Sequence, residues 1–229
     1  MQLLRMTRFS IPALACAILA GSFAVSRVRA QQQGAQPPAA SQAASRGGRG
    51  GRGGRGNAFS NLTITTTAWP DGGMIPLRYT QAGPEVSPAV QWSTPPANTT
   101  SFVLVFHDAD ALAGNSTDDL LLWLLWNIPG TATGLPQNVA DGFELPDGTR
   151  QISVSGSRYR GPGASSTGPM HHYVLDLYAL DSTLDVRVNP QGPQDPNPNV
   201  QTIRTSVFQA MAGHVRGKAA YLGLFRRPE

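Results

Sequence analysis

The sequence predicts a mainly β fold with a single late helix. Short apolar or alternating runs recur between Gly- and Pro-rich turn signals, which is typical of antiparallel strands joined by short connections. One segment near the C-terminus instead repeats its apolar residues at helical spacing. The 25 Gly and 19 Pro residues among 229 also favour loops and turns over long helices.

Successive apolar runs are expected to form the strands. The first, residues 62–67, is rich in β-branched side chains and ends at a turn over residues 69–73. The next two are continuously apolar, as expected for buried strands, and the second of them closes on Pro129-Gly130. In chain order the expected strands are residues 62–67, 102–106, 120–128, 151–154, 173–180 and 218–225.

The expected helix follows a loop over residues 189–199, which holds four Pro residues. Gly213 is the expected C-cap, because glycine adopts the left-handed conformation that commonly ends a helix. The apolar residues of this segment fall on one helical face at steps of 3, 4, 1 and 3: Val200, Ile203, Val207, Phe208 and Met211.

The positive charge of the chain, formally +4, lies outside the part that is expected to fold. Residues 1–30 resemble a signal peptide, with basic residues before an apolar run and Val28-Arg29-Ala30 as a cleavage site. Residues 31–56 are rich in Gln, Ala and Pro and then in Arg and Gly, so we expect a disordered linker. Residues 57–229 form the expected domain, whose 10 basic and 14 acidic residues give a charge of 10 − 14 = −4.

This distribution of charge sets the expected location and partners. A signal peptide predicts export to the periplasm or the extracellular space, and an uncleaved signal would leave an N-terminal membrane anchor. We do not expect a nucleic-acid partner, because the excess basic residues belong to the signal and the linker. The Arg/Gly-rich arm has two interpretations: peripheral contact with a membrane or another anionic polymer, or a soluble tether.

Several familiar signatures are missing from the part that is expected to fold. Residues 57–229 contain no GxGxxG, P-loop, HExxH or GxSxG motif and no zinc-ligand spacing, so we expect neither the commonest nucleotide and hydrolase classes nor a cofactor. The single cysteine, Cys16, excludes an internal disulfide. Three Asn-x-Ser/Thr sites match the acceptor pattern for glycans in a eukaryotic secretory pathway, a pattern that usually carries no meaning in a bacterium: Asn61, Asn98 and Asn115.

Two groups of residues carry the candidate chemistry. Asp108 and Asp110 follow the apolar strand expected at residues 102–106, and strand alternation places them on one side with His107 on the other. Such carboxylates can share a proton, bind a cation or cap loop N–H groups. The second group is a Gly/Pro-rich loop, residues 156–163, followed by His171-His172. A loop of this kind offers backbone N–H groups to an anion, and one of the two histidines is expected to point inward.

Through these two groups of residues and several other short fragments, the chain resembles the phosphatidylethanolamine-binding protein family, especially its bacterial Raf-kinase-inhibitor-like branch. The resemblance runs from about residue 62 to residue 225. Each matching fragment is short, and their order and spacing make the resemblance specific. The fragments are DGGMIPLRYT at 71–80, EVSP at 85–88 followed by Trp92, DAD at 108–110, WLLWNIP at 123–129 with TGLP at 133–136, YRGP at 159–162, HHY at 171–173, YALD at 178–181 and MAGHV at 211–215.

The resemblance implies a large antiparallel sheet packed on a smaller sheet, with a C-terminal helix. It also implies a surface pocket for a small anionic ligand, such as a phosphoryl group or a lipid headgroup. Several members of the family regulate partner proteins rather than catalyse a reaction. Carried over to this sequence, the ligand-binding residues would be Asp108, Asp110, Gly161, Pro162 and His171, with Tyr159 close by and Tyr173 as an aromatic wall or support.

The sequence departs from the family pattern at this pocket. Leu122 stands where the family usually has a histidine, so one of two pocket imidazoles is missing. The loss removes a donor that can be cationic, which leaves an anion less well neutralised. The other departures are His107, Leu112, His172, Phe225 and an Ala in place of Pro between the two aspartates.

Three functional hypotheses follow from the sequence. The first is an exported, non-enzymatic binding module for an anionic ligand. The second is a protein-interaction or inhibitor module whose pocket is degenerate. The third, which we favour least, is a hydrolase in which Asp108, Asp110 and His171, with His107 as a further candidate, hold a divalent metal ion.

Overall fold

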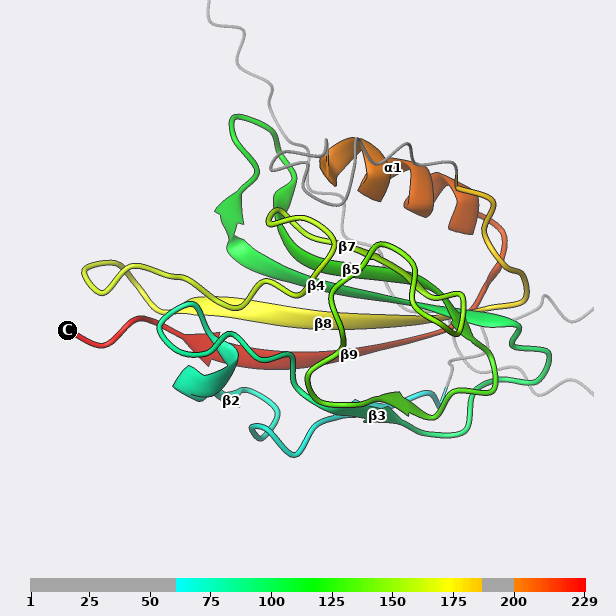
Figure 1. Cartoon of the computed structure of the whole chain (residues 1–229), viewed down its shortest axis with the longest axis horizontal. Coiled ribbons are helices and arrows are strands. Elements are labelled where there is room, and N and C mark those ends of the chain that lie inside the picture. Colours follow the sequence, from blue (N-terminus) through cyan, green and yellow to red (C-terminus); the bar gives the residue numbers. More distant parts are fainter. Residues whose placement is uncertain (1–60, 187–199) are drawn as a thin grey trace, which may run out of the picture. The chain divides into compact units, whose positions relative to one another are not determined.

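The computed structural model describes residues 61–186 and 200–229, which belong to one compact unit. Its strands form two sheets, and a helix covers one face of the larger sheet (Figure 1). The signal, the linker and the loop expected over residues 1–30, 31–56 and 189–199 lie outside the described residues. The elements are β1 (Ile64–Thr65), β2 (Gly73–Met74), the 3-10 turn η1 (Leu77–Tyr79), β3 (Val90–Trp92), β4 (Ser101–Leu112), β5 (Asp119–Pro129), β6 (Gly134–Leu135), β7 (Arg150–Ile152), β8 (His171–Leu180), α1 (Val200–Met211) and β9 (Val215–Phe225).

The larger sheet has the strand order β2-β9-β8-β4-β5-β7. Neighbouring strands are antiparallel except for the short β2, which runs parallel to β9. The central β4 pairs with β8 on one side and with β5 on the other. This register places Tyr173 of β8 and Leu120 of β5 directly beside Asp108 of β4. Residues that are far apart in the sequence therefore meet at one end of the sheet.

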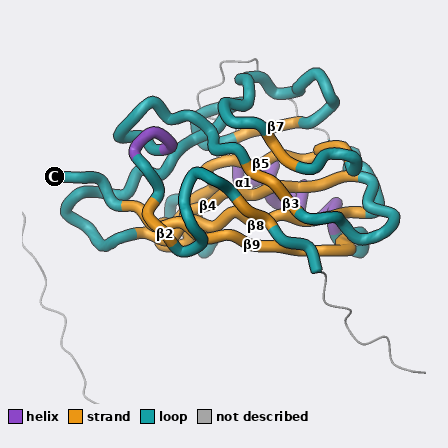
Figure 2. The backbone as a smooth tube through the Cα atoms, turned by 90° about the horizontal axis from the view of Figure 1, so that it is seen from below, coloured by secondary structure: helices purple, strands orange, loops and turns teal. Residues whose placement is uncertain are grey.

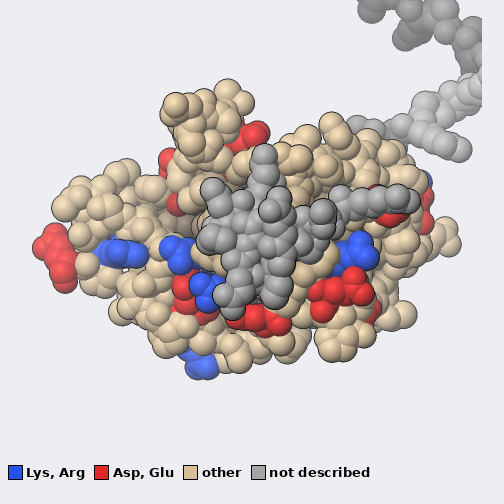
Figure 3. Space-filling view, turned by 45° about the horizontal axis from the view of Figure 1, so that its top comes forward, with Lys and Arg blue, Asp and Glu red and all other residues tan. Residues whose placement is uncertain are grey.

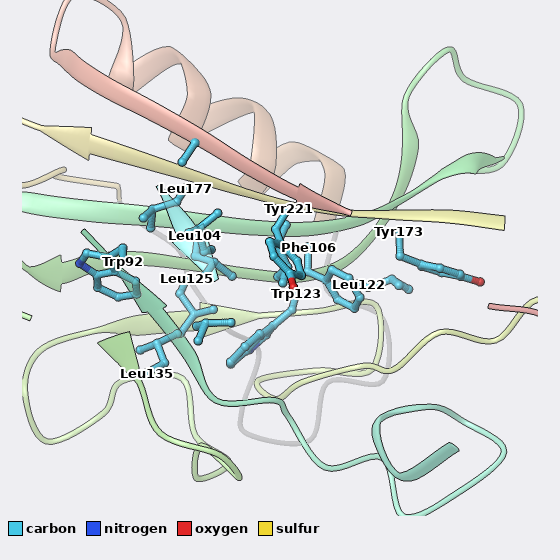
Figure 4. Close-up of a cluster of buried hydrophobic side chains, with 14 of the residues drawn as sticks. Trp92, Leu104, Phe106, Leu122, Trp123, Leu125, Leu135, Tyr173, Leu177 and Tyr221 are labelled. Atoms are coloured by element: carbon cyan, nitrogen blue, oxygen red, sulfur yellow. The ribbon is translucent and has the colours of Figure 1, made fainter. Parts of the chain in front are cut away.

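The smaller sheet, β1-β3-β6, packs on one face of the larger sheet, and α1 packs on the other. Alternation along β4 divides its apolar residues between two cores: Phe102, Leu104 and Phe106 face the smaller sheet, whereas Val103 and Val105 face the helix. Because residues 102–106 of β4 are buried on both faces, this stretch is continuously apolar. Figure 4 shows side chains of the core between the two sheets.

Helix α1 begins and ends where its apolar spacing predicts. After it, Gly213 has a φ of 84°, a left-handed conformation that favours glycine, and this confirms the expected end of the helix. Within the described residues, no helix is long and apolar enough to cross a membrane. The residues that α1 buries against the sheet are Val200, Ile203, Val207 and Met211.

Some strand boundaries differ from the expected ones. The strand expected at residues 62–67 is only two residues long, because the Thr66 hydroxyl donates to the Ala89 carbonyl at 2.6 Å and accepts the Ala68 N–H at 3.0 Å. The sequence gives no sign of β2, which falls partly within the expected turn at residues 69–73. Strands β4, β5, β8 and β9 extend beyond their expected limits.

Charges of both signs mix on the face that carries α1. Figure 3 shows Lys and Arg side chains lying among Asp and Glu on this face. Ion pairs account for part of the mixture: Arg204 with Asp119, and Lys218 with Asp176 at 3.1 Å. The three Asn-x-Ser/Thr asparagines are all exposed: Asn61, Asn98 and Asn115.

Candidate ligand pocket

The candidate pocket lies at the end of the larger sheet where β4 ends and β5 and β8 begin. Figure 2 shows the loops that gather at this end, near the C-terminus. A cavity of about 340 Å³ lies here. A larger cavity of about 570 Å³, beside α1, includes none of the predicted site residues in its wall. The residues that line the pocket are Gln81, Asp108, Ala111, Leu120, Leu122, Val154, Arg160, Gly163, Ala164, Ser165 and His171.

Asp108 and His171 form the polar centre of this pocket. The His171 Nδ1 lies 2.8 Å from Asp108 Oδ2, and Asp108 Oδ1 accepts the N–H of Asp110 at 3.0 Å. Asp108 is only 3% exposed, so its carboxylate depends on these protein donors rather than on water. With Nδ1 engaged, Nε2 is the ring nitrogen left for a ligand, and protonation of the ring makes it a charged donor.

Tyr173, which pairs with Asp108 across the neighbouring strand, supports its carboxylate. Its ring is buried, and its hydroxyl accepts the N–H of Ala164 at 3.2 Å. Burial, and then the charge of Asp108 and hydrogen bonding to it, raise the pKa of Tyr173 well above its usual range. Tyr173 therefore stays a neutral phenol beside the carboxylate, and it fits the support role that the family resemblance implies.

Asp110, in contrast, does not line the pocket. Its Oδ2 accepts the backbone N–H of His172 at 2.6 Å and lies 2.8 Å from the His172 ring Nδ1. Hydrogen bonds from the His172 backbone and then from its ring lower the pKa of Asp110. The two side chains are 41% and 53% exposed. Strand alternation predicts that both aspartates serve one site, but the pairing of β4 with β5 is irregular after Asp108, and the two form separate pairs.

Tyr173 and three further predicted residues also lie outside the lining. Tyr159 is a core residue: its hydroxyl donates to the Tyr79 carbonyl at 2.8 Å, and burial raises its pKa well above its usual range. The Gly161 N–H, expected to face an anion, instead donates to Glu85 Oε1 at 3.1 Å. The Pro162 carbonyl accepts the Gln81 N–H at 2.9 Å. These residues hold the wall of the pocket in place.

Arg160 is a charged pocket residue that was not among the residues predicted from the sequence. Its Nη2 donates to Gln81 Oε1 at 2.7 Å, and its Nη1 lies 3.4 Å from Glu85 Oε1. It stands inside the YRGP fragment, where it could have been noticed as a cation beside the predicted glycine. Gln81 is 79 residues away in the sequence, and no local pattern points to it.

Leu122, the residue in place of the usual histidine, does line the pocket and is 1% exposed. Leu120 from the same strand and Val154 extend this apolar surface. In the sheet, β5 and β8 lie on opposite sides of β4, so Leu122 and His171 flank Asp108. The pocket therefore has an apolar side from β5 and a polar side from β8 and the loop that precedes it.

His107 points away from the pocket, as alternation predicts. Its Nδ1 lies 2.6 Å from Asp119 Oδ2, and its Nε2 lies 3.6 Å from Asp176 Oδ2. Burial alone would raise the pKa of Asp176, but hydrogen bonds from His107 and Lys218 lower it. Across residues 61–186 and 200–229, no three His, Cys, Asp or Glu side chains are grouped so that they could hold a metal ion.

Known proteins are similar to this sequence over most of its length. The family model described as phosphatidylethanolamine-binding protein matches residues 65–226. A UPF0098 protein of Methanothermobacter thermautotrophicus is 38% identical over 168 residues, which cover 72% of this chain and 99% of that protein. A protein of Mycobacterium tuberculosis named as a lipoprotein, LppC, is 31% identical over 166 residues, or 72% of each chain.

Solved structures share the fold. A phosphatidylethanolamine-binding protein homologue from Chlamydia trachomatis, CT736, gives a TM-score of 0.57 at 22% identity, covering 72% of this chain and 97% of that one. Escherichia coli YbcL, described as a member of the mammalian family, gives 0.54 at 19% identity, covering 72% and 98%. The match of the family model over residues 65–226 establishes that the chain belongs to the phosphatidylethanolamine-binding protein family.

Proposed function

We propose that this protein is an exported, non-enzymatic binding module whose pocket takes a small anionic ligand, of the phosphoryl or lipid-headgroup type. The observation that carries the proposal is the convergence of His171 and Arg160 on one cavity of about 340 Å³. Both side chains donate hydrogen bonds, and charged donors are the usual partners of phosphoryl and carboxylate groups. Family membership supports a binding role.

The state of the polar groups favours binding over catalysis. Asp108 is already engaged by His171 and by the N–H of Asp110, so its carboxylate holds the imidazole in place. The hydroxyls of Tyr159 and Tyr173 both have protein partners. This arrangement resembles a rigid recognition site, in which each donor is fixed by a neighbour before the ligand arrives.

Export rests on a different observation. Residues 1–30 have the basic start, apolar run and small-residue cleavage site of a signal peptide. The name of the LppC relative, a lipoprotein, points the same way. Detection of a mature chain that begins at Gln31 in the exported fraction would support this part of the proposal. Recovery of only the full-length chain from the cytoplasm would contradict it.

Calorimetric titration tests the binding role. Phosphoethanolamine and inorganic phosphate are titrated into wild-type protein and into His171→Ala, with His172→Ala as the matched control outside the pocket. We expect saturable binding that the first variant loses and the control keeps. No saturable binding to either probe would refute the proposal.

One observation favours a second candidate, a protein-interaction or inhibitor module with an unused pocket. Leu122 removes a polar group from the pocket wall, so an anion loses a partner there. This candidate predicts a protein partner, captured from the exported fraction, whose binding survives His171→Ala. Deletion of residues 31–56 then separates capture by the arm from capture by the domain.

A further inference from the structure

We propose that the pocket selects an anion that carries an apolar body, such as an aryl or short alkyl phosphate, over bare phosphate or a hydrophilic headgroup. The inference rests on the proposed binding function and names the ligand class of the same site. The two sides of the pocket, apolar along β5 and cationic along the loop before β8, are the observation behind it.

Four apolar side chains make up the apolar side. Leu120 and Leu122 come from β5, and Ala111 and Val154 join them in the lining. None of these side chains can hydrogen-bond to a headgroup, so a hydrophilic ligand would lose its water there without compensation. An apolar group would instead leave water on entry. Burying the equivalent of about two methylene groups against this side lowers Kd roughly tenfold.

The polar side is held ready for an anion by Arg160. Gln81 and Glu85 fix its guanidinium from one side, which limits the rotamers that binding would otherwise have to freeze. A guanidinium is a planar fork that matches the oxygens of a phosphate or carboxylate. Arg160 therefore replaces, from the loop, the cationic donor that Leu122 does not supply from β5.

Asp108 decides how such a ligand lies. Its carboxylate is in the pocket wall between the two sides and repels a second negative charge. The anionic group therefore sits toward Arg160 and His171, and the remainder of the ligand extends along Leu122. A volume of about 340 Å³ leaves room for this remainder, since it is within the range of small-molecule sites.

Calorimetry with three probes tests this selectivity: inorganic phosphate, phosphoethanolamine and phenyl phosphate. We expect phenyl phosphate to bind wild-type protein about tenfold more tightly than phosphate does. Leu122→His should reverse the preference by strengthening phosphate and weakening phenyl phosphate. Because Leu122 is buried, Val154→Thr serves as a milder second variant, which should weaken phenyl phosphate relative to phosphate about threefold. Arg160→Gln should weaken all three probes by a similar factor.

The outcomes separate the two proposals. If phosphate and phenyl phosphate bind equally well and depend on His171 and Arg160, the binding function stands and the selectivity is refuted. If phenyl phosphate binds tightly but neither Leu122→His nor Val154→Thr changes its affinity, the apolar side is not the contact and the inference is refuted. If no probe binds, the proposed function itself fails.

Discussion

Asp108 and Asp110 are two residues apart in the sequence, but their replacement by asparagine should have very different consequences. Asp108 is 3% exposed and accepts from His171 and from the Asp110 N–H, with the Tyr173 hydroxyl also hydrogen-bonded to it. Asparagine keeps one acceptor oxygen and turns the other into a donor. Asp108→Asn therefore removes a charged acceptor from a buried site, and the loss of the charge-assisted hydrogen bonds costs about 2 kcal/mol.

For a domain of this size, about 2 kcal/mol corresponds to a fall in Tm of roughly 4–8 °C. In Asp110→Asn the side chain is 41% exposed and its amide oxygen still accepts the His172 N–H, so we expect a change of under about 1 kcal/mol. Thermal unfolding followed by circular dichroism at pH 7 measures both. Equal falls in Tm, or a larger fall for Asp110→Asn, would refute the separation of the two aspartates.

Three other perturbations follow from the structure. Asp176→Asn should reduce the loss of stability that the protein shows below about pH 4. Folding lowers the pKa of the Asp176 carboxyl, so this group stabilises the folded protein above its unfolded pKa and loses that contribution as the pH falls. Urea unfolding at pH 7 and pH 3 measures the difference in stability. Tyr159→Phe should lower the free energy of unfolding by about 1 kcal/mol in the same assay and leave ligand affinity unchanged, since its hydroxyl donates only to the Tyr79 carbonyl. A large loss of affinity would instead show that Tyr159 contacts the ligand. Gly161→Ala should cost about 1–3 kcal/mol, because a Cβ there would lie 2.5 Å from the Tyr79 carbonyl oxygen, whereas Gly168→Ala, with its nearest atom at 3.8 Å, should change little; equal melting temperatures for the two would contradict the close approach.

The predictable parts of the fold are those with local physical causes. Apolar spacing locates α1 to the residue, and the buried runs locate the central strands, because periodicity records which side chains leave water. No such periodicity marks β2, because its two residues join the sheet through a parallel pairing with β9, some 150 positions away. The short β1 is set by the hydroxyl of Thr66, which diverts the backbone after two residues.

The site divides in the same way. The pairing of Asp108 with His171 could be anticipated from the family resemblance, and so could the missing imidazole at Leu122. Asp110 lies outside the lining of the cavity, because alternation fails where the β4–β5 pairing becomes irregular. Gln81 could not be found, because its role exists only once two distant loops meet.

Neighbouring residues of β4 serve opposite faces of the larger sheet, and this has a consequence for folding. His107 faces the helix side with Asp119 and Asp176, and Asp108 faces the pocket with His171. A slip of β4 by one residue would exchange the two, leaving an imidazole in the cavity and an unpaired carboxylate under the helix. The pairing error would thus be penalised twice. A molecule that occupies the cavity recognises only the correct register, so it would draw misaligned chains back toward the native state by mass action.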